Sequence, residues 1–195
     1  MPRDLVPPRV HIVGRRNSGK TTLICELIAA ISQQGLNVGS IKHTPHRHEF
    51  DHPGKDSHRH RAAGACAAGI ISPDAGAVFW TIPPEYDREQ RYAALLRMYV
   101  ECDIVLVEGD TQTAAPKVEV WRSAVGLPPF ASEGLAVHAV ISDDTTDLAP
   151  ELWPRADIHG LSRNILRLAS RSPRLDQGLP AGSQHETQED AVASC

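Results

Sequence analysis

Residues 9–22 read Arg-Val-His-Ile-Val-Gly-Arg-Arg-Asn-Ser-Gly-Lys-Thr-Thr, and this stretch decides the fold. The β-rich run at residues 9–13 stops at Gly14, as a buried strand would. Apolar residues then recur at helical spacing from Lys20 to about residue 34, and Gly35 can end that helix. The stretch therefore predicts a strand, a glycine-rich turn and a helix in direct succession.

The glycine-rich turn matches the pattern GxxxxGK[ST] over residues 14–21. Glycine permits backbone conformations in which successive N–H groups converge on one point, and the following helix directs the positive end of its dipole there. Lys20 can neutralise the terminal phosphates of a nucleotide, and the Thr21 hydroxyl can bind the Mg²⁺ that bridges them. A structural turn with a surface lysine is the alternative. The predicted nucleotide-binding residues are Gly14, Arg16, Asn17, Ser18, Gly19, Lys20, Thr21 and Thr22.

A phosphate loop usually works with a carboxylate at the end of a neighbouring strand. Asp103 and Glu108 bracket an aliphatic run, and at about 3.3 Å per residue they lie about 16 Å apart, so only one can reach the site. Ligands of doubly wound sheets bind at the carboxyl ends of the strands, which selects Glu108. We predict that Glu108 is linked to the magnesium and is catalytic together with Lys20, with Asp110 in reserve.

A second polar segment contains most of the histidines. Lys42 and His43 close the predicted strand at residues 37–43, and a dense polar loop follows. This loop can contact a second anionic ligand or a metal, or it can be a solvated loop; a Ni²⁺ or Zn²⁺ site is a further alternative. Six of the ten histidines fall between residues 43 and 60: His43, His46, His48, His52, His58 and His60.

The composition is that of a single globular domain. The chain has 195 residues, 41% of them hydrophobic, and no apolar run is long enough for a membrane span or a secretory signal, so we expect a cytoplasmic protein. The net charge of −4 argues against a general nucleic-acid-binding surface. The four cysteines match no CxxC pattern, and we expect buried, reduced thiols.

Strand and helix patterns alternate along the chain, which predicts an α/β fold: a mostly parallel sheet of the P-loop NTPase type, flanked by helices and interrupted by a β-hairpin insertion. We expect a leader at residues 1–8, the nucleotide-binding domain at 9–171 and a disordered tail at 172–195. The hairpin is predicted at 69–72 and 77–82, further helices at 56–68, 84–101 and 161–170, and further strands at 103–107, 117–122, 136–141 and 156–159.

Several of these segments together resemble one family. They are the phosphate loop, the strand end Ile41-Lys42-His43, residues 50–57 (Phe-Asp-His-Pro-Gly-Lys-Asp-Ser) with Arg59 and residues 62–65, and Leu106-Val107-Glu108-Gly109. In this order, from about residue 9 to 170, the chain resembles the molybdopterin-guanine dinucleotide biosynthesis protein B family, MobB. The phosphate loop is widespread, whereas the Lys-His and Pro-Gly-Lys-Asp-Ser combination is far more specific.

The resemblance implies a GTP-binding protein with weak GTPase activity, usually a homodimer, that assists the guanylyltransferase MobA in attaching GMP to molybdenum-bound molybdopterin. It implies phosphate and magnesium roles for Lys20 and Thr21, and it places Lys42, His43, Lys55 and Asp56 in a loop beside the nucleotide. Family members often have an aromatic residue and a lysine after Glu-Gly, where this chain has Asp110-Thr111.

Preference for GTP over ATP rests on the resemblance alone, because the chain has no Asn-Lys-x-Asp motif. Ser142-Asp143 is the place where base contacts are expected. Two other functions use the same loop. One is a metallochaperone NTPase for a nickel enzyme, which the clustered histidines favour; the other is a small-molecule kinase, for which residues 44–55 are the candidate lid.

Overall fold

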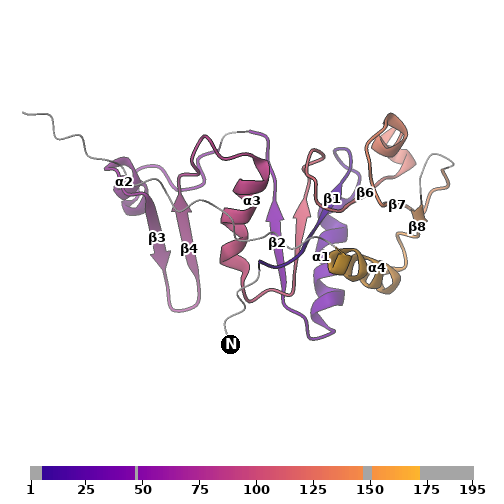
Figure 1. The fold of residues 1–195 in the computed structure, drawn as a ribbon, viewed down its shortest axis with the longest axis horizontal. Coiled ribbons are helices and arrows are strands. Elements are labelled where there is room, and N and C mark those ends of the chain that lie inside the picture. Colours follow the sequence, from indigo (N-terminus) through magenta and orange to yellow (C-terminus); the bar gives the residue numbers. More distant parts are fainter. Residues whose placement is uncertain (1–5, 47, 147–150, 172–195) are drawn as a thin grey trace, which may run out of the picture.

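The computed structural model describes residues 6–46, 48–146 and 151–171, and the main chain forms a six-stranded sheet with helices on both faces (Figure 1). The strand order is β2-β5-β1-β6-β7-β8, and every neighbouring pair is parallel. The predicted α/β fold with a parallel sheet is confirmed. The strands are β1 (Arg9–Val13), β2 (Val38–Lys42), β5 (Ile104–Glu108), β6 (Lys117–Val120), β7 (Ala139–Ile141) and β8 (Leu152–Trp153).

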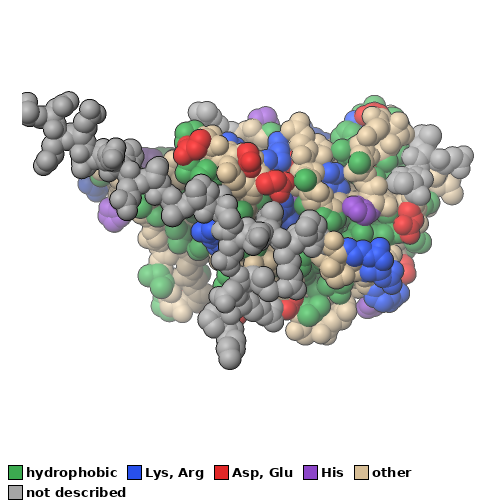
Figure 2. Space-filling view, in the orientation of Figure 1, with side chains coloured by type: hydrophobic (Ala, Val, Ile, Leu, Met, Phe, Trp, Pro, Cys, Tyr) green, Lys and Arg blue, Asp and Glu red, His purple; other side chains and the backbone are tan. Residues whose placement is uncertain are grey.

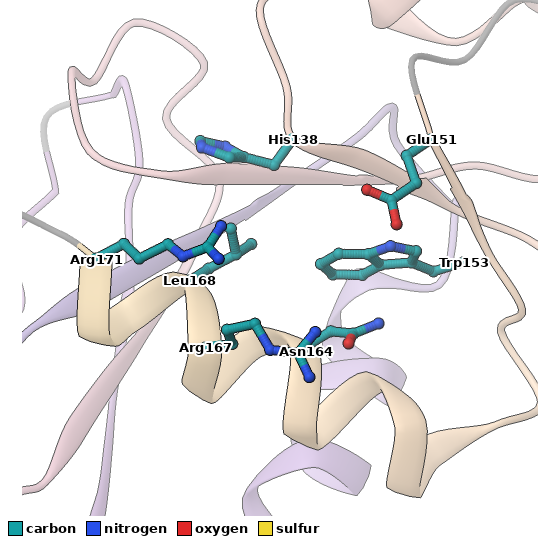
Figure 3. A pocket seen from close by; sticks show the side chains of 7 residues that line it. All are labelled: His138, Glu151, Trp153, Asn164, Arg167, Leu168 and Arg171. Atoms are coloured by element: carbon teal, nitrogen blue, oxygen red, sulfur yellow. The ribbon is translucent and has the colours of Figure 1, made fainter.

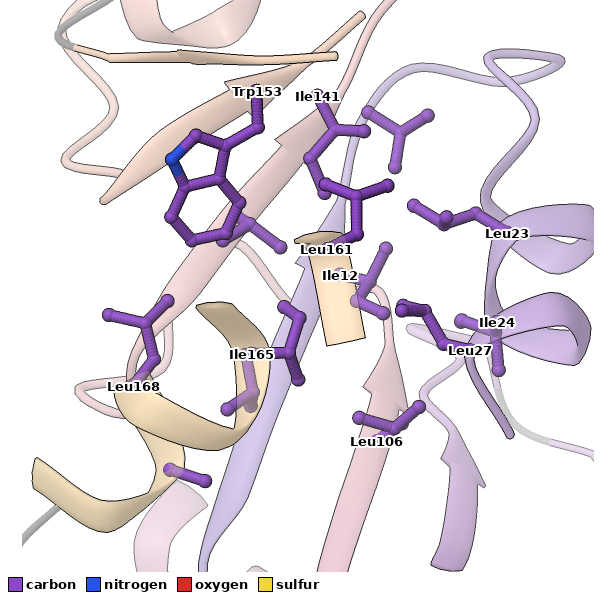
Figure 4. Close-up of a cluster of buried hydrophobic side chains, with 14 of the residues drawn as sticks. Ile12, Leu23, Ile24, Leu27, Leu106, Ile141, Trp153, Leu161, Ile165 and Leu168 are labelled. Atoms are coloured by element: carbon purple, nitrogen blue, oxygen red, sulfur yellow. The ribbon is translucent and has the colours of Figure 1, made fainter. Parts of the chain in front are cut away.

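Helices α1 (Lys20–Ser32) and α4 (Ile158–Arg171) cover one face of this sheet, and α3 (Arg88–Leu96) covers the other. Alternate side chains of a strand point to opposite faces, so Ile12 of β1 packs with α1 and α4 whereas His11 contacts α3. Figure 4 shows Ile12 and Leu106 between side chains of the two helices. The strand that precedes the phosphate loop is therefore buried on both faces, which holds the loop in a rigid frame.

The insertion lies beside the sheet and forms a separate two-stranded unit (Figure 1). Strands β3 (Ala67–Ile71) and β4 (Gly76–Trp80) pair antiparallel, as predicted, and α2 (Asp56–Ala62) precedes them. The Ser72 hydroxyl donates to the Asp74 carboxylate at 2.8 Å, which stabilises the turn between the strands. The hairpin connects α2 to α3 without adding a strand to the main sheet.

The predicted helix at residues 56–68 is too long. Helix α2 ends at Ala62 because Gly64 adopts φ +105°, a conformation that stops a helix, and the following alanines enter β3. Helix α3 is also shorter than predicted. It begins after Asp87, whose side chain forms a capping box with Gln90, and a 3₁₀ turn at Arg97–Tyr99 follows it.

The predicted strand at 156–159 is wrong. The edge strand is β8, only two residues long, and α4 already begins at Ile158. The Asp157 carboxylate accepts a hydrogen bond from the Gly160 backbone N–H at 2.9 Å, as a helix-capping residue does. A strand this short leaves no periodic pattern in the sequence, so only its pairing with β7 identifies it.

The prediction that the thiols are buried is wrong for the three cysteines in the described ranges: Cys25 and Cys66 are exposed and Cys102 is half-buried, and none of the three is in a disulfide. Cys195 and the predicted tail at 172–195 lie outside the described residues. Of the predicted leader, residues 6–8 are described, and the Pro8 carbonyl accepts a hydrogen bond from Val105 at 2.9 Å. None of the helices in the described ranges has the length and apolar character required to cross a membrane.

Candidate nucleotide-binding site

The phosphate loop occupies the turn between β1 and α1. Gly14, Asn17 and Gly19 have φ values of +144°, +63° and +97°, and these positive values turn the backbone as a phosphate-binding loop requires. A Cβ atom on Gly14 would lie 2.3 Å from the Val120 carbonyl oxygen, so β6 leaves no space for a side chain there. The first glycine of the motif is therefore required by packing as well as by conformation.

The ammonium group of Lys20 lies over this loop. Its Nζ donates to the carbonyl oxygens of Gly14 at 2.9 Å and Arg15 at 2.7 Å. Burial lowers the pKa of Lys20; Glu108 opposes that shift and Lys42 adds to it. The amine is thus held where the loop opens, with one carboxylate and one further cation near it.

Glu108 is the last residue of β5 and lies opposite Ile12 in the adjacent strand β1. The Thr21 hydroxyl lies 3.0 Å from each oxygen of its carboxylate. A hydroxyl and a carboxylate side by side are the hard oxygen ligands that Mg²⁺ prefers. No group of three or more His, Cys, Asp or Glu side chains that could hold a metal exists among the described residues, so Mg²⁺ here would need phosphate and water as its other ligands.

Six of the eight predicted loop residues, and Glu108, line one cavity of about 550 Å³. Two members of the predicted nucleotide set do not line it: Gly14 lies within the loop backbone, and Ser18 lies beneath it, 4% exposed. The Ser18 hydroxyl has no hydrogen-bond partner within the described ranges. The cavity is lined by Arg16, Asn17, Gly19, Lys20, Thr21, Thr22, Glu108 and Arg122.

Arg122 is the cavity residue that sequence reasoning missed. It follows β6, which pairs with β1, and the backbone on either side of it is anchored: Trp121 N donates to the Ile141 carbonyl at 3.1 Å and Ser123 N to the Asp144 carboxylate at 2.7 Å. The available signal was its place at the end of the strand predicted at 117–122, which in the structure already ends at Val120. Strand order, which the sequence did not provide, was needed to use it.

Arg15 has a structural role instead of a place in the cavity. Its guanidinium forms an ion pair with Glu133, donates to the Pro128 carbonyl at 2.9 Å and lies 4.3 Å from the centre of the Phe130 ring. The buried carboxylate of Glu119 accepts from Phe130 N at 2.7 Å in the same segment. These contacts connect residues 128–133 to the phosphate loop.

Lys42 and His43 lie at the same edge of the sheet but outside the cavity. Lys42 is opposite Glu108 in the β2–β5 register, and His43 N donates to the Glu108 carbonyl at 3.0 Å. Lys55 and Asp56 stand exposed at the start of α2 and do not line the cavity either. The role of these four residues beside a nucleotide stays a prediction.

Asp110, the reserve carboxylate, also lies outside the cavity. It is buried on the α3 side, where Arg88 donates to it at 2.5 Å and the Tyr92 hydroxyl at 2.9 Å. These donors lower the pKa of the Asp110 carboxyl against the opposing effect of burial. On the same face, His11 contacts the Gly109 carbonyl at 3.1 Å, and burial lowers the pKa of His11 to about 4.

The histidine-rich segment forms its own structure. The Asp51 carboxylate accepts from His52 N and from the Ser57 hydroxyl, both at 2.8 Å, and Arg61 pairs with Glu49 at 3.2 Å. His46 and His48 line a second cavity, of about 630 Å³, together with apolar side chains of β4 and Phe50. The metallochaperone alternative is not supported, since the described histidines belong to no group of three or more His, Cys, Asp or Glu side chains that could hold a metal.

Ser142 and Asp143, where base contacts were expected, follow β7 and do not line the nucleotide cavity. The Asp143 carboxylate accepts from the Ala156 backbone N–H at 2.8 Å, and Ser142 is buried. Contact with a base stays a prediction for these two residues.

Comparison with known proteins adds independent information. A sequence profile of the family described as "MobB: Molybdopterin guanine dinucleotide synthesis protein B" matches residues 9–143. The chain is 34% identical over 159 residues to the molybdopterin-guanine dinucleotide biosynthesis adapter protein of Escherichia coli K12, which covers 80% of this chain and 89% of that protein. It is 36% identical over 117 residues to the probable adapter protein of Bacillus subtilis, covering 58% and 64% of the two chains.

Solved structures resemble the fold as well. The crystal structure of Bacillus subtilis MobB aligns with a TM-score of 0.61 and 27% identity, covering 83% of this chain and 98% of that one. The MobB homologue from Bacillus stearothermophilus aligns with a TM-score of 0.57 and 28% identity, covering 82% and 97%. With this profile match, these relatives and the phosphate loop in place, the chain belongs to the MobB family of P-loop NTPases.

Proposed function

We propose that the protein is an accessory factor of molybdenum cofactor biosynthesis that binds GTP and Mg²⁺ at the phosphate loop. The relatives are named adapter proteins of molybdopterin-guanine dinucleotide biosynthesis, which supports the pathway. The observation that carries the nucleotide part is the shared cavity of Lys20, Thr21 and Glu108, whose volume of about 550 Å³ accommodates a nucleotide.

In this proposal each group has one task. The backbone N–H groups between Asn17 and Thr21 and the start of α1 hold the phosphates. Lys20 moves from the loop carbonyls to the terminal phosphates, and Thr21 with Glu108 holds Mg²⁺ or its bound water. Held there, Mg²⁺ would supply positive charge that offsets the charge of the phosphates.

Arg122 supplies the remaining positive charge. Arginine near the transferred phosphate stabilises the charge that develops in the transition state. Arg122 follows β6, on the other side of β1 from β5, and the backbone N–H groups of both its neighbours are hydrogen-bonded. We expect Arg122→Ala to lower the GTP turnover rate by about tenfold or more with a smaller change in GDP affinity, as measured in single-turnover assays.

Calorimetric titration of GTP and ATP, each with and without Mg²⁺, tests the nucleotide proposal. The expected result is tighter binding of GTP that depends on Mg²⁺. We expect slow GTP turnover. Phosphate release is measured during the titration as a control, to show that little GTP is hydrolysed while binding is recorded. Equal binding of both nucleotides, or no binding of either, contradicts the proposal.

The partner in this proposal is the guanylyltransferase that attaches GMP to molybdopterin, and the working form is a homodimer. Co-purification with that enzyme, with and without GTP, tests the adapter role, and Lys20→Ala serves as the nucleotide-deficient control. Sedimentation at several concentrations tests the dimer. Capture of the enzyme only in the presence of GTP would link nucleotide binding to assembly; no capture under either condition contradicts the adapter role.

A further inference from the structure

A third cavity, rich in hydrogen-bond donors, lies at the β8 edge of the main sheet, between that edge and α4 (Figure 3). Its volume is about 160 Å³. Two of its lining residues, His138 and Glu151, immediately precede β7 and β8, so it opens at the amino ends of parallel strands. The phosphate loop follows the carboxyl end of β1, and none of the residues of the nucleotide cavity lines this one. The two cavities are separate sites.

Helix α4 forms the other wall and presents two arginines. Arg167 and Arg171 lie one turn apart, and Figure 3 shows both projecting from the side of the helix that carries Leu168. Neither guanidinium has an ion-pair partner among the described residues. In Figure 2, Lys and Arg side chains gather over this helix, on a chain whose net charge is −4. An arginine in the last turn also interacts favourably with the helix dipole, so the pair alone does not indicate a ligand.

The buried indole of Trp153 provides the independent observation. This side chain is only 7% exposed, and it forms part of the cavity wall. Its Nε1 donor has no hydrogen-bond partner within the described part of the chain. A buried N–H without an acceptor costs free energy and is rare in folded proteins. A ligand that offers an acceptor oxygen in this cavity removes that cost.

Glu151 narrows the chemistry of that ligand. Figure 3 shows its carboxylate beside the edge of the indole that carries the nitrogen. A carboxylate repels a fully ionised anion but accepts a hydrogen bond from one that keeps a proton. The ligand must therefore present oxygens to the arginines and Trp153, and an O–H to Glu151. Phosphate carries such a proton near neutral pH, and sulfate does not.

We propose that this cavity binds a protonated phosphate group, either as the free ion or on a small monoester. Arg167, Arg171 and Trp153 Nε1 donate hydrogen bonds to its oxygens, and Glu151 accepts its proton. Charge-assisted hydrogen bonds of this kind are short and strong, and guanidinium groups match phosphate geometry. The site is independent of the GTP proposal, because it shares no residue with the phosphate loop.

The indole N–H signal of Trp153 tests the site directly. The chain has three tryptophans, so a ¹⁵N-labelled sample gives three indole signals, of which Trp153→Phe identifies one. Titration with inorganic phosphate should shift that signal saturably, whereas sodium sulfate should not. Glycerol phosphate at pH 6 is the monoester arm, and tighter binding of glycerol phosphate than of inorganic phosphate indicates an organic ligand. Phosphate that enters the phosphate loop does not disturb this reading, since the signal reports on Trp153.

Matched variants separate a built site from general charge attraction. Arg167→Gln and Arg171→Gln should each weaken phosphate binding about tenfold or more. Arg163→Gln removes the same charge from an exposed position of α4 outside the cavity and should leave binding unchanged. Glu151→Gln should admit sulfate. The proposal is overturned if phosphate leaves the Trp153 signal unmoved, if sulfate binds the unmodified protein as well as phosphate does, or if Arg163→Gln weakens binding as much as Arg167→Gln.

Discussion

The phosphate loop and the histidine-rich segment at residues 43–60 both follow a strand of the main sheet, and both are polar and glycine-containing. Their polar side chains differ in what they contact. At the loop, Lys20 and Thr21 of α1 and Glu108 of β5 face one cavity. In the histidine-rich segment, the charged groups pair mainly with each other, as Glu49 does with Arg61, and the adjacent cavity has largely apolar walls. The spacing of the motif therefore predicted side chains that share one polar cavity, whereas the clustering of histidines did not.

The largest expected difference between the two regions is the loss of folding stability when one glycine of each is replaced by alanine. Gly14→Ala should lower the free energy of unfolding by at least about 3 kcal/mol, because the new methyl group meets the Val120 carbonyl at a left-handed φ. Gly54→Ala should lose only about 1 to 2 kcal/mol, since Gly54 has a positive φ but open space around it. Urea unfolding of both variants measures the difference, and equal losses would contradict the packing argument.

The second test removes one lysine from each region. Lys20→Ala should weaken GTP binding by about 1.5 to 3 kcal/mol, because a charge-assisted contact to phosphate disappears. Lys55→Ala removes the same charge from an exposed position at the start of α2 and should change the affinity by less than about 0.5 kcal/mol. Calorimetry with Mg²⁺ measures both. A comparable loss in the Lys55 variant would place the histidine-rich segment at the nucleotide.

His11, three residues before the loop, differs from the clustered histidines because it is fully buried. Burial lowers its pKa from 6.5 to about 4, so the unfolded chain binds a proton that the folded protein does not. The stability that results is present above pH 6.5 and is lost as the pH falls toward 4. Between pH 7 and pH 5 this amounts to about 2 kcal/mol. Urea unfolding at both pH values should show a smaller pH dependence in His11→Gln; an unchanged dependence would contradict this assignment.

The smallest effect is expected for the exposed histidines. The double variant His46→Ala, His48→Ala should change GTP affinity by less than about twofold, because surface substitutions away from a site have small effects. Zinc and nickel titrations should detect no tight, stoichiometric binding in the unmodified protein, since the described residues form no metal-binding group. If the unmodified protein binds zinc or nickel tightly and the double variant does not, the metallochaperone hypothesis would be supported again.

Much of the fold was predictable because its signals are local. The run at Arg9–Val13, the motif at 14–21 and the aliphatic strand that ends at Glu108 each leave a pattern within a few residues, and parallel-sheet geometry then selected Glu108 over Asp103. The errors occurred where the pattern is short or ambiguous. Strand β8 has two residues, and the alanines before β3 are compatible with either helix or strand.

The sequence by itself determined the phosphate loop, because glycine spacing dictates which backbone conformations are accessible, and it determined the class of the sheet, because buried strands need continuous apolar runs. Only the tertiary structure decided which side chains share a cavity. Arg122 lines the candidate nucleotide cavity and Arg15 does not, although Arg15 lies within the motif, because the pairing of β6 with β1 and the packing of residues 128–133 are contacts between distant segments. Such contacts depend on the strand order, which no local pattern encodes.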